Sequence, residues 1–169
     1  MAANIRAWSP EDSVAELTDL LHAAYAPLAA RGLNLVGLTQ TDEMTARRIA
    51  RGECMVAADS GHIVGTLLFV RRSQDTEWYR RPDVGVVFQL AVHPDYQHQG
   101  IGSRLIAAVE RRARATGCTE LALDTADSAS HLIAWYGRHG FRRVGRLQWP
   151  GRGHRSVILS KRLAGGRRG

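Results

Sequence analysis

The segment from Val86 to Arg114 constrains the fold of this 169-residue chain more than any other. It opens with an almost unbroken apolar run, Val86 to Val92, which is typical of a strand buried on both faces. Gln89 is the only polar residue in that run, and Pro94 follows shortly after its end. The pattern therefore predicts a central strand of a covered sheet.

A glycine-bearing loop joins this strand to a predicted helix. Gly100 and Gly102 lie in the loop, and the helix is predicted by apolar residues spaced by four: Ile101, Leu105, Val109 and Ala113. The first N–H groups of a helix have no partner within it, and the helix dipole adds positive charge there. A strand, a glycine loop and a helix start together predict an anion site, and a tight turn that needs glycine is the alternative.

The string Leu-Ala-Val-His-Pro-Asp-Tyr-Gln-His-Gln-Gly-Ile-Gly resembles the acetyl-CoA-binding segment of the GCN5-related N-acetyltransferase (GNAT) superfamily, whose signature is (Gln/Arg)-x-x-Gly-x-(Gly/Ala). Gln97, Gly100 and Gly102 occupy the signature positions. The resemblance continues at Leu121-Ala-Leu-Asp and at Trp135-Tyr-Gly-Arg-His-Gly-Phe. It implies an α/β (α+β) fold: a mixed, mostly antiparallel sheet flanked by helices, with splayed parallel central strands.

The order of predicted elements agrees with that fold. Periodicity and turn residues give β-α-α-β-β-β-α-β-α-β-β, with one parallel pair between the strand at Val86 and the strand at Leu121. The resemblance implies that these two strands separate, and we expect the separation after Leu90. No repeat or linker interrupts the chain, so we expect a single domain over 1–163 and a disordered basic tail over 164–169.

Composition excludes several classes of protein. With 44% hydrophobic and 23% charged residues the chain is expected to be globular, and no apolar run approaches the ~20 residues of a membrane span. The start lacks a secretory signal, and two cysteines, Cys54 and Cys118, have no metal-site spacing, so we expect a cytoplasmic protein without a metal. The net charge is +7, but no stacking aromatics alternate with the arginines, so nucleic acid is not the expected partner. A homodimer is left open.

The resemblance implies a set of site residues. Leu90 matches the residue whose backbone N–H faces the thioester carbonyl, Val92 matches one whose backbone pairs with pantetheine, and Tyr136 matches a general acid near the cofactor sulfur. A tyrosine with a reference pKa of about 10 arrives protonated and can donate. The pyrophosphate is expected on the loop, with help from the N–H groups of Ser103 and Arg104. The full cofactor-binding set is Leu90, Ala91, Val92, Gln97, His98, Gln99, Gly100, Ile101, Gly102, Ser103, Arg104 and Tyr136, and the catalytic pair is Tyr136 and Leu90.

Two departures from the family pattern leave the general base open. Relatives with a catalytic glutamate place it where this chain has Val86, and many relatives carry an asparagine where it has Ala129. The amine must still lose a proton, so we considered the acids and histidines near the expected acceptor side, and we expect a water chain to serve instead. These residues are Glu77, Asp83, Asp124, His93 and His154.

The implied function is an acetyl-CoA-dependent N-acetyltransferase that acts on a primary amine of a small molecule, peptide or protein. Direct attack in a ternary complex is expected, because nothing marks Cys118 as an acyl-carrying nucleophile. The acceptor is expected between the 33–41 loop, the 71–83 segment and the final hairpin. A non-catalytic acetyl-CoA-binding regulatory module and a basic nucleic-acid-binding protein are the alternatives.

Overall fold

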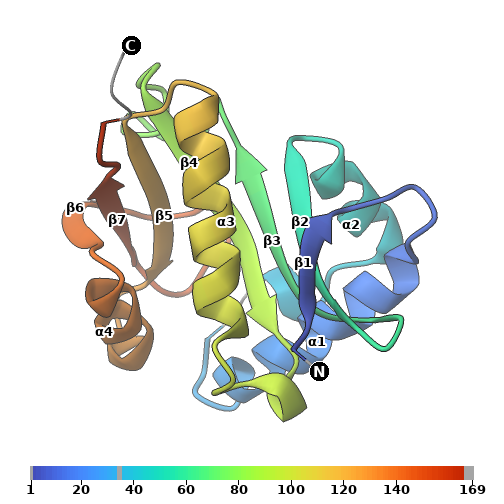
Figure 1. The fold of residues 1–169 in the computed structure, drawn as a ribbon. Coiled ribbons are helices and arrows are strands. Elements are labelled where there is room, and N and C mark those ends of the chain that lie inside the picture. Colours follow the sequence, from blue (N-terminus) through green and yellow to red (C-terminus); the bar gives the residue numbers. More distant parts are fainter. Residues whose placement is uncertain (1, 34–35, 166–169) are drawn as a thin grey trace. The chain divides into compact units, whose positions relative to one another are not determined.

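The computed structural model describes residues 2–33 and 36–165. Its helices are α1 (Val14–Ala29), α2 (Asp42–Ile49), α3 (Ile101–Ala115) and α4 (Ser130–Arg138), with short 3-10 turns η1 (Val36–Leu38) and η2 (Pro94–Tyr96). The strands are β1 (Asn4–Ala7), β2 (Glu53–Asp59), β3 (His62–Val70), β4 (Val84–Val92), β5 (Glu120–Ala126), β6 (Arg142–Leu147) and β7 (Ser156–Arg162). The order along the chain confirms the predicted order (Figure 1).

The strands form a seven-stranded sheet in the order β1-β2-β3-β4-β5-β7-β6. The pairs β1/β2, β2/β3, β5/β7 and β6/β7 are antiparallel, whereas β4 and β5 are parallel. This arrangement confirms the predicted mixed, mostly antiparallel sheet. The parallel pairing covers only Val84–Val86, opposite Glu120–Ala122, so it ends four residues earlier than the expected point at Leu90.

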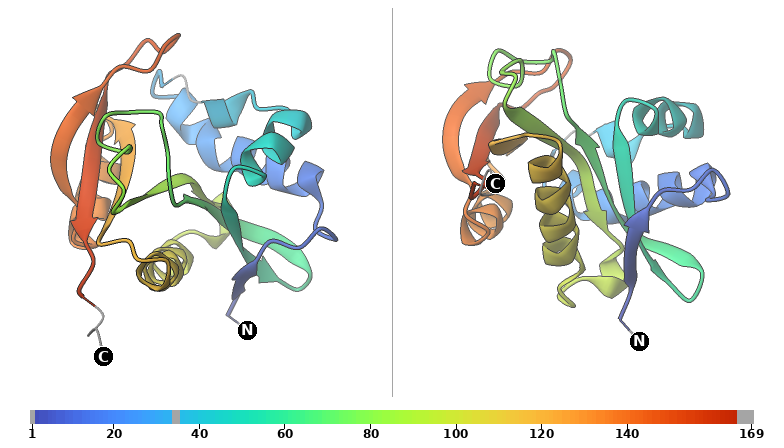
Figure 2. Two further views of the ribbon diagram at one scale, coloured as in Figure 1. Left: turned by 90° about the horizontal axis from the view of Figure 1, so that it is seen from above. Right: turned by 45° about the horizontal axis from the view of Figure 1, so that its top comes forward.

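The chain forms two compact units, and β4 and α3 each contribute to both. The first unit holds residues 1–69 and 88–109. Within it, α1 and α2 lie on one face of β1–β3 and the first half of α3 lies on the other (Figure 2). Gly65 of β3 permits that close approach, because a Cβ there would lie 3.1 Å from Ile101 and 3.3 Å from Leu105.

Local sequence explains the helices of the first unit. α1 begins after Ser13, whose hydroxyl accepts from the Glu16 N–H at 3.2 Å, and α2 begins after Thr41, whose hydroxyl accepts from the Met44 N–H in the same way. In α3, the predicted apolar stripe of Ile101, Leu105, Val109 and Ala113 is buried. The stripe faces the core because its members recur every four residues.

The second unit holds residues 70–87 and 110–169. Its core runs along β5 and β7, where consecutive residues are buried, among them Leu121, Leu123, Val157 and Leu159. The second half of α3 is tied to β7 by an ion pair between Lys161 Nζ and Glu110 Oε1 at 2.6 Å.

Within the described residues, no helix combines the length and the apolarity that crossing a membrane requires. Residues 166–169 of the predicted basic tail lie outside the described residues. The prediction of a single domain over 1–163 stays a prediction.

Candidate functional site

The site is built around the end of β4 in the first unit. Gln89 has φ +53°, a left-handed conformation inside a strand that L-residues rarely adopt. Beyond it, Ala91 is buried, whereas Leu90 and Val92 are half-buried. The Leu90 carbonyl accepts a hydrogen bond from the Tyr25 hydroxyl of α1 at 3.0 Å. The strand therefore changes course at the residue that precedes Leu90.

A short turn then fixes the loop against the sheet. The His93 N–H donates to the Val64 carbonyl of β3 at 2.9 Å, and His93 Nδ1 accepts from the Asp95 N–H at 3.2 Å. The Gln97 side chain reaches back, and its Nε2 donates to the Val92 carbonyl at 3.2 Å. Backbone and side-chain hydrogen bonds therefore both fix the direction in which the loop leaves β4.

Two left-handed residues shape the loop before α3. His98 has φ +61° and Gly100 has φ +78°. Left-handed residues also occur in anion-binding nests, in which successive backbone N–H groups face a common side. A Cβ built on Gly100 would meet no atom within 4 Å, so the backbone there is open to a ligand.

The first turn of α3 supplies further donors. The Gly100 carbonyl accepts from the Arg104 N–H at 3.0 Å, which places Gly100 at the cap of the helix. The N–H groups of Ile101 and Gly102 therefore belong to the set that a helix cannot satisfy internally. Because the Arg104 N–H is used within the helix, the exposed Arg104 side chain is the part of that residue able to meet a phosphate.

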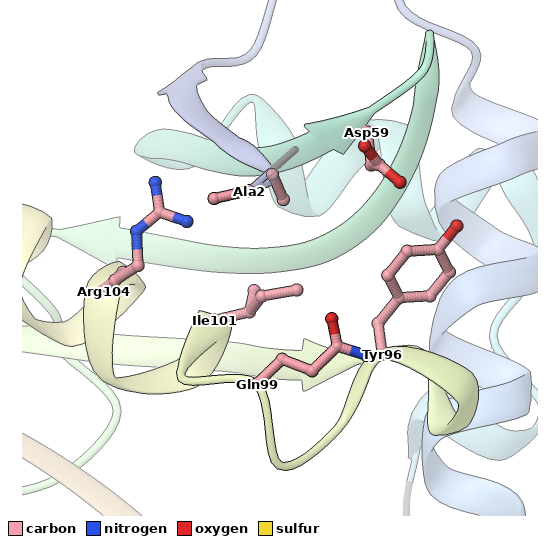
Figure 3. A pocket seen from close by; sticks show the side chains of 7 residues that line it. Ala2, Asp59, Tyr96, Gln99, Ile101 and Arg104 are labelled. Atoms are coloured by element: carbon pink, nitrogen blue, oxygen red, sulfur yellow. The ribbon is translucent and has the colours of Figure 1, made fainter.

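A shallow pocket of about 130 Å³ lies beside this helix start (Figure 3). It is lined by Ala2, Ala3, Asp59, Tyr96, Gln99, Ile101 and Arg104. The pocket holds one carboxylate, Asp59 at the end of β2, and one guanidinium, Arg104, so the two charges together give an anion no net attraction inside it. A phosphate therefore fits better over the open backbone at Gly100 than in the pocket.

Tyr136 lies in the second unit, on α4. It is 9% exposed and packs edge-to-face against Trp135 and Phe141, with ring centroids 5.0 Å and 5.8 Å away. All the other predicted site residues lie in the first unit, where the chain runs from β4 through the loop into α3.

Two of the carboxylates considered as a base are already engaged. Asp83 accepts from Thr119 Oγ1 at 2.8 Å and from Arg81 at 3.1 Å, and these contacts lower its pKa below the ordinary value. Asp124 accepts from Tyr79 at 2.8 Å and from Trp149 at 2.7 Å, and burial raises its pKa. Because each carboxylate already accepts these hydrogen bonds, neither is well placed to take a proton from an amine.

The remaining candidates differ in their surroundings. Glu77 is exposed, and His93 uses its Nδ1 to cap the η2 turn. Burial and the charge of Arg152 lower the pKa of His154, so this imidazole is neutral at neutral pH. His154 is half-buried, in the loop between β6 and β7.

Sequence reasoning missed one residue that holds the end of β4 in the first unit and one that holds Asp124 in the second unit. Gln40, buried in the connection between α1 and α2, donates from Nε2 to Gln89 Oε1 at 3.0 Å. Tyr79, fully buried, bonds Asp124. The one local signal was Gln89 itself, a polar residue in an apolar run.

Comparison with known proteins places the chain in a family. Residues 15–141 match the model of the acetyltransferase (GNAT) family. The chain is 31% identical over 94 residues to the N-alpha-acetyltransferase MAK3 of Arabidopsis thaliana. The matched region covers 56% of this chain and 47% of that protein. It is 29% identical over 109 residues to the acetyltransferase plu1384 of Photorhabdus laumondii, with 64% of each covered. The chain thus spans about half to two thirds of the length of these two relatives.

The fold also matches solved structures. A GNAT family acetyltransferase from Elizabethkingia anophelis, solved with acetyl-CoA bound, superposes with a TM-score of 0.69 at 18% identity, covering 96% of this chain and 99% of that one. The strand order, the loop between β4 and α3 and the family match agree with one another. This chain belongs to the acetyltransferase (GNAT) family, as its sequence predicted.

Proposed function

We propose that this chain is an acetyl-CoA-dependent N-acetyltransferase that acts on a primary amine of a small molecule, a peptide or a protein. The observation that carries the proposal is the continuous run from the end of β4, through the left-handed loop at His98 and Gly100, into α3, in a member of the acetyltransferase family. One relative is an N-alpha-acetyltransferase, which favours nitrogen as the accepting atom.

The loop and helix start fit a cofactor that carries phosphates. The backbone at Gly100 is open to approach, and the amides of Ile101 and Gly102 lie at the positive end of the helix dipole. The exposed Arg104 side chain adds a cation. We assign Gln97, His98, Gln99, Gly100, Ile101, Gly102, Ser103 and Arg104 to the pyrophosphate of coenzyme A.

The end of β4 fits the acyl end of the cofactor. When bound, acetyl-CoA supplies an activated acetyl group and a thiol leaving group. We assign the Leu90 N–H to the thioester carbonyl oxygen and the backbone of Ala91 and Val92 to the pantetheine arm. A fixed donor aimed at an oxygen that gains charge is worth on the order of 10²–10³ in rate.

Tyr136 is the proposed proton donor for the departing thiol. It is buried beside Trp135 and Phe141, and a tyrosine with its reference pKa of about 10 is protonated at neutral pH. A protonated phenol can give its proton to sulfur as the carbon–sulfur bond breaks.

Deprotonation of the amine is assigned to solvent in this proposal. Val86 and Ala129 stand where relatives of the family carry polar groups, and Asp83 and Asp124 are held by other partners. Direct attack follows from the cysteines, because Cys54 and Cys118 are both buried. Two buried, free thiols also fit a reducing compartment, so we place the protein in the cytoplasm.

Two measurements on the purified chain test this function. Calorimetry with acetyl-CoA reports cofactor binding, and release of free thiol in the presence of a panel of amines and amino-terminal peptides reports transfer. We expect saturable binding and amine-dependent thiol release. Binding without release by any amine would favour a regulatory module, and absence of binding would overturn the proposal.

A further inference from the structure

Gln89 combines two features that stability alone does not explain. Its backbone is left-handed in the middle of β4, and its side chain is buried, with only 8% of the residue exposed. A non-glycine residue keeps a left-handed backbone only when its surroundings determine it, and such residues gather at functional sites. The contacts of the Gln89 side chain should therefore explain what holds this backbone conformation.

The side chain of Gln89 is held by two donors from the helical layer. Gln89 Oε1 accepts from Gln40 Nε2 at 3.0 Å and from Arg48 Nη1 of α2 at 3.4 Å. Because both neighbours donate, the oxygen of the Gln89 amide must face them, and the orientation of the amide is set.

Gln40 is in turn anchored to both helices. It is 1% exposed, and its Nε2 also donates to Thr45 Oγ1 of α2 at 2.8 Å. Thr18 of α1 donates to the same Thr45 oxygen at 2.8 Å, and His22 Nε2 lies 2.8 Å from the Gln40 carbonyl. The left-handed residue in β4 is thus connected through Gln40 to α1 and α2.

The peptide after Gln89 is held from the same layer. The Tyr25 hydroxyl of α1 donates to the Leu90 carbonyl at 3.0 Å. Gly37 of η1 packs directly on the Tyr25 ring, and a Cβ on Gly37 would overlap that ring. Tyr25 is therefore confined by η1 while it holds Leu90.

The cluster leaves polar atoms unsatisfied. Among the residues that the structure describes, Gln89 Nε2 and Gln40 Oε1 are buried without a hydrogen-bond partner. Buried unsatisfied groups destabilise a fold, and a pair of apolar residues of similar shape would avoid that loss. The amide pair is thus better explained by the geometry that it imposes on β4 than by a gain in stability.

We propose that Gln40 and Gln89 are positioning residues of the thioester site: their amide pair holds the left-handed backbone of β4 and thereby directs the Leu90 N–H. This inference rests on the proposed function. Neither side chain touches the reacting atoms. Through Thr18, Thr45 and Tyr25, the direction of that N–H is set by α1, η1 and α2 rather than by the strand alone.

The decisive variant is Gln40→Leu, which removes the donor to Gln89 at similar volume. We expect kcat to fall by at least about tenfold while the Kd for acetyl-CoA stays within about threefold, because the effect concerns the direction of one donor and not the cradle. Thr66→Val is the matched control, since Thr66 is a fully buried polar residue of β3 whose hydroxyl bonds the Met55 carbonyl and not β4. The control should lower stability and leave kcat within about twofold.

Substitutions at Gln89 separate backbone direction from side-chain chemistry. Glycine adopts positive φ readily and alanine does not, so Gln89→Gly should keep several times more activity than Gln89→Ala. In the Gln89→Gly background, Gln40→Leu should have little further effect, because its partner is gone. Equal activities of the glycine and alanine variants would overturn the inference.

One readout needs no acceptor amine. The carbonyl stretch of bound acetyl-CoA, followed by infrared difference spectroscopy, reports how strongly a donor polarises the thioester. We expect a shift to lower frequency in the wild-type protein and in Thr66→Val, and a smaller shift in Gln40→Leu. A wild-type protein that binds no acetyl-CoA refutes the proposed function and this inference with it. A wild-type protein that binds and acetylates, beside a Gln40→Leu protein with the same shift and the same kcat, refutes the positioning inference alone.

Discussion

The Tyr79 hydroxyl donates to Asp124 Oδ1 at 2.8 Å, and Trp149 Nε1 donates to the other carboxyl oxygen at 2.7 Å. Tyr79 belongs to the 71–83 segment and Trp149 to the loop between β6 and β7, so the half-buried Asp124 joins two loops of the second unit to β5. Burial raises the pKa of Asp124, and burial together with this carboxyl raises the pKa of Tyr79. The group is a structural junction of the second unit.

Replacing Asp124 should therefore affect stability more than chemistry. In Asp124→Asn, one of the two donors loses its acceptor, so we expect the free energy of unfolding in urea to fall by about 1–3 kcal/mol. Asp19→Asn, an exposed change on α1, is the control and should stay within about 0.5 kcal/mol of the wild type. A stable Asp124→Asn protein that binds acetyl-CoA and has lost activity would instead identify Asp124 as the base.

His154 should make stability depend on pH. Burial and Arg152 depress its pKa in the folded protein below the unfolded value of about 6.5. The stability linked to the neutral ring is complete above that unfolded value and is lost as pH falls through the depressed folded pKa. We expect the wild type to lose more unfolding free energy than His154→Asn between about pH 7.5 and about pH 5, in parallel denaturation curves. Identical losses in the two proteins would contradict this.

Tyr136→Phe tests the proposed proton donor. We expect kcat to fall by about ten- to a hundredfold, because a positioned acid contributes roughly 10²–10⁴-fold, while affinity for acetyl-CoA changes little. Phe141→Leu is the control for disturbed packing around α4, because the Phe141 ring packs against the Tyr136 ring. Full activity of Tyr136→Phe with an efficient acceptor would remove the phenol from the mechanism.

No single side chain is expected to deprotonate the amine. His154→Ala, Glu77→Gln and Asp83→Asn should each keep kcat within about tenfold of the wild type. The rise of activity with pH near neutrality should persist in all three, because it reports ionisation of the free amine. Loss of about a thousandfold in one of them, with cofactor binding intact, would show that this residue is the base.

Gly100→Ala tests the cradle. Gly100 has a left-handed backbone in open surroundings, so a side chain there strains the loop and occupies the approach to the phosphate. We expect affinity for acetyl-CoA to fall by more than about tenfold, about 1.4 kcal/mol, in calorimetry. Gly61→Ala is a matched control, because Gly61 has φ +86° in equally open surroundings at the turn between β2 and β3. Equal affinities of the two variants would argue against a phosphate at Gly100.

Local patterns in the sequence were sufficient to predict the family of the chain and the order of its helices and strands. The apolar run from Val86 to Val92 and the stripe through Leu105 predict a strand and a helix because each period belongs to one kind of element. Gly100 is predictable as well, since a left-handed turn before a helix favours glycine wherever it occurs. These features depend on neighbours within a few residues, so the chain specifies them without its tertiary contacts.

Only the tertiary structure decided how β4 ends and what supports it. The sequence shows Gln89 as an anomaly, but neither its positive φ nor its hydrogen bond from Gln40, which lies 49 residues earlier in the chain, could be read from it. The parallel pairing stops at Val86 rather than at Leu90, and Asp124 is engaged by Tyr79 across 45 residues. Such long-range contacts leave no periodic trace in the sequence, because they arise only when separate elements pack and their buried polar groups must find partners.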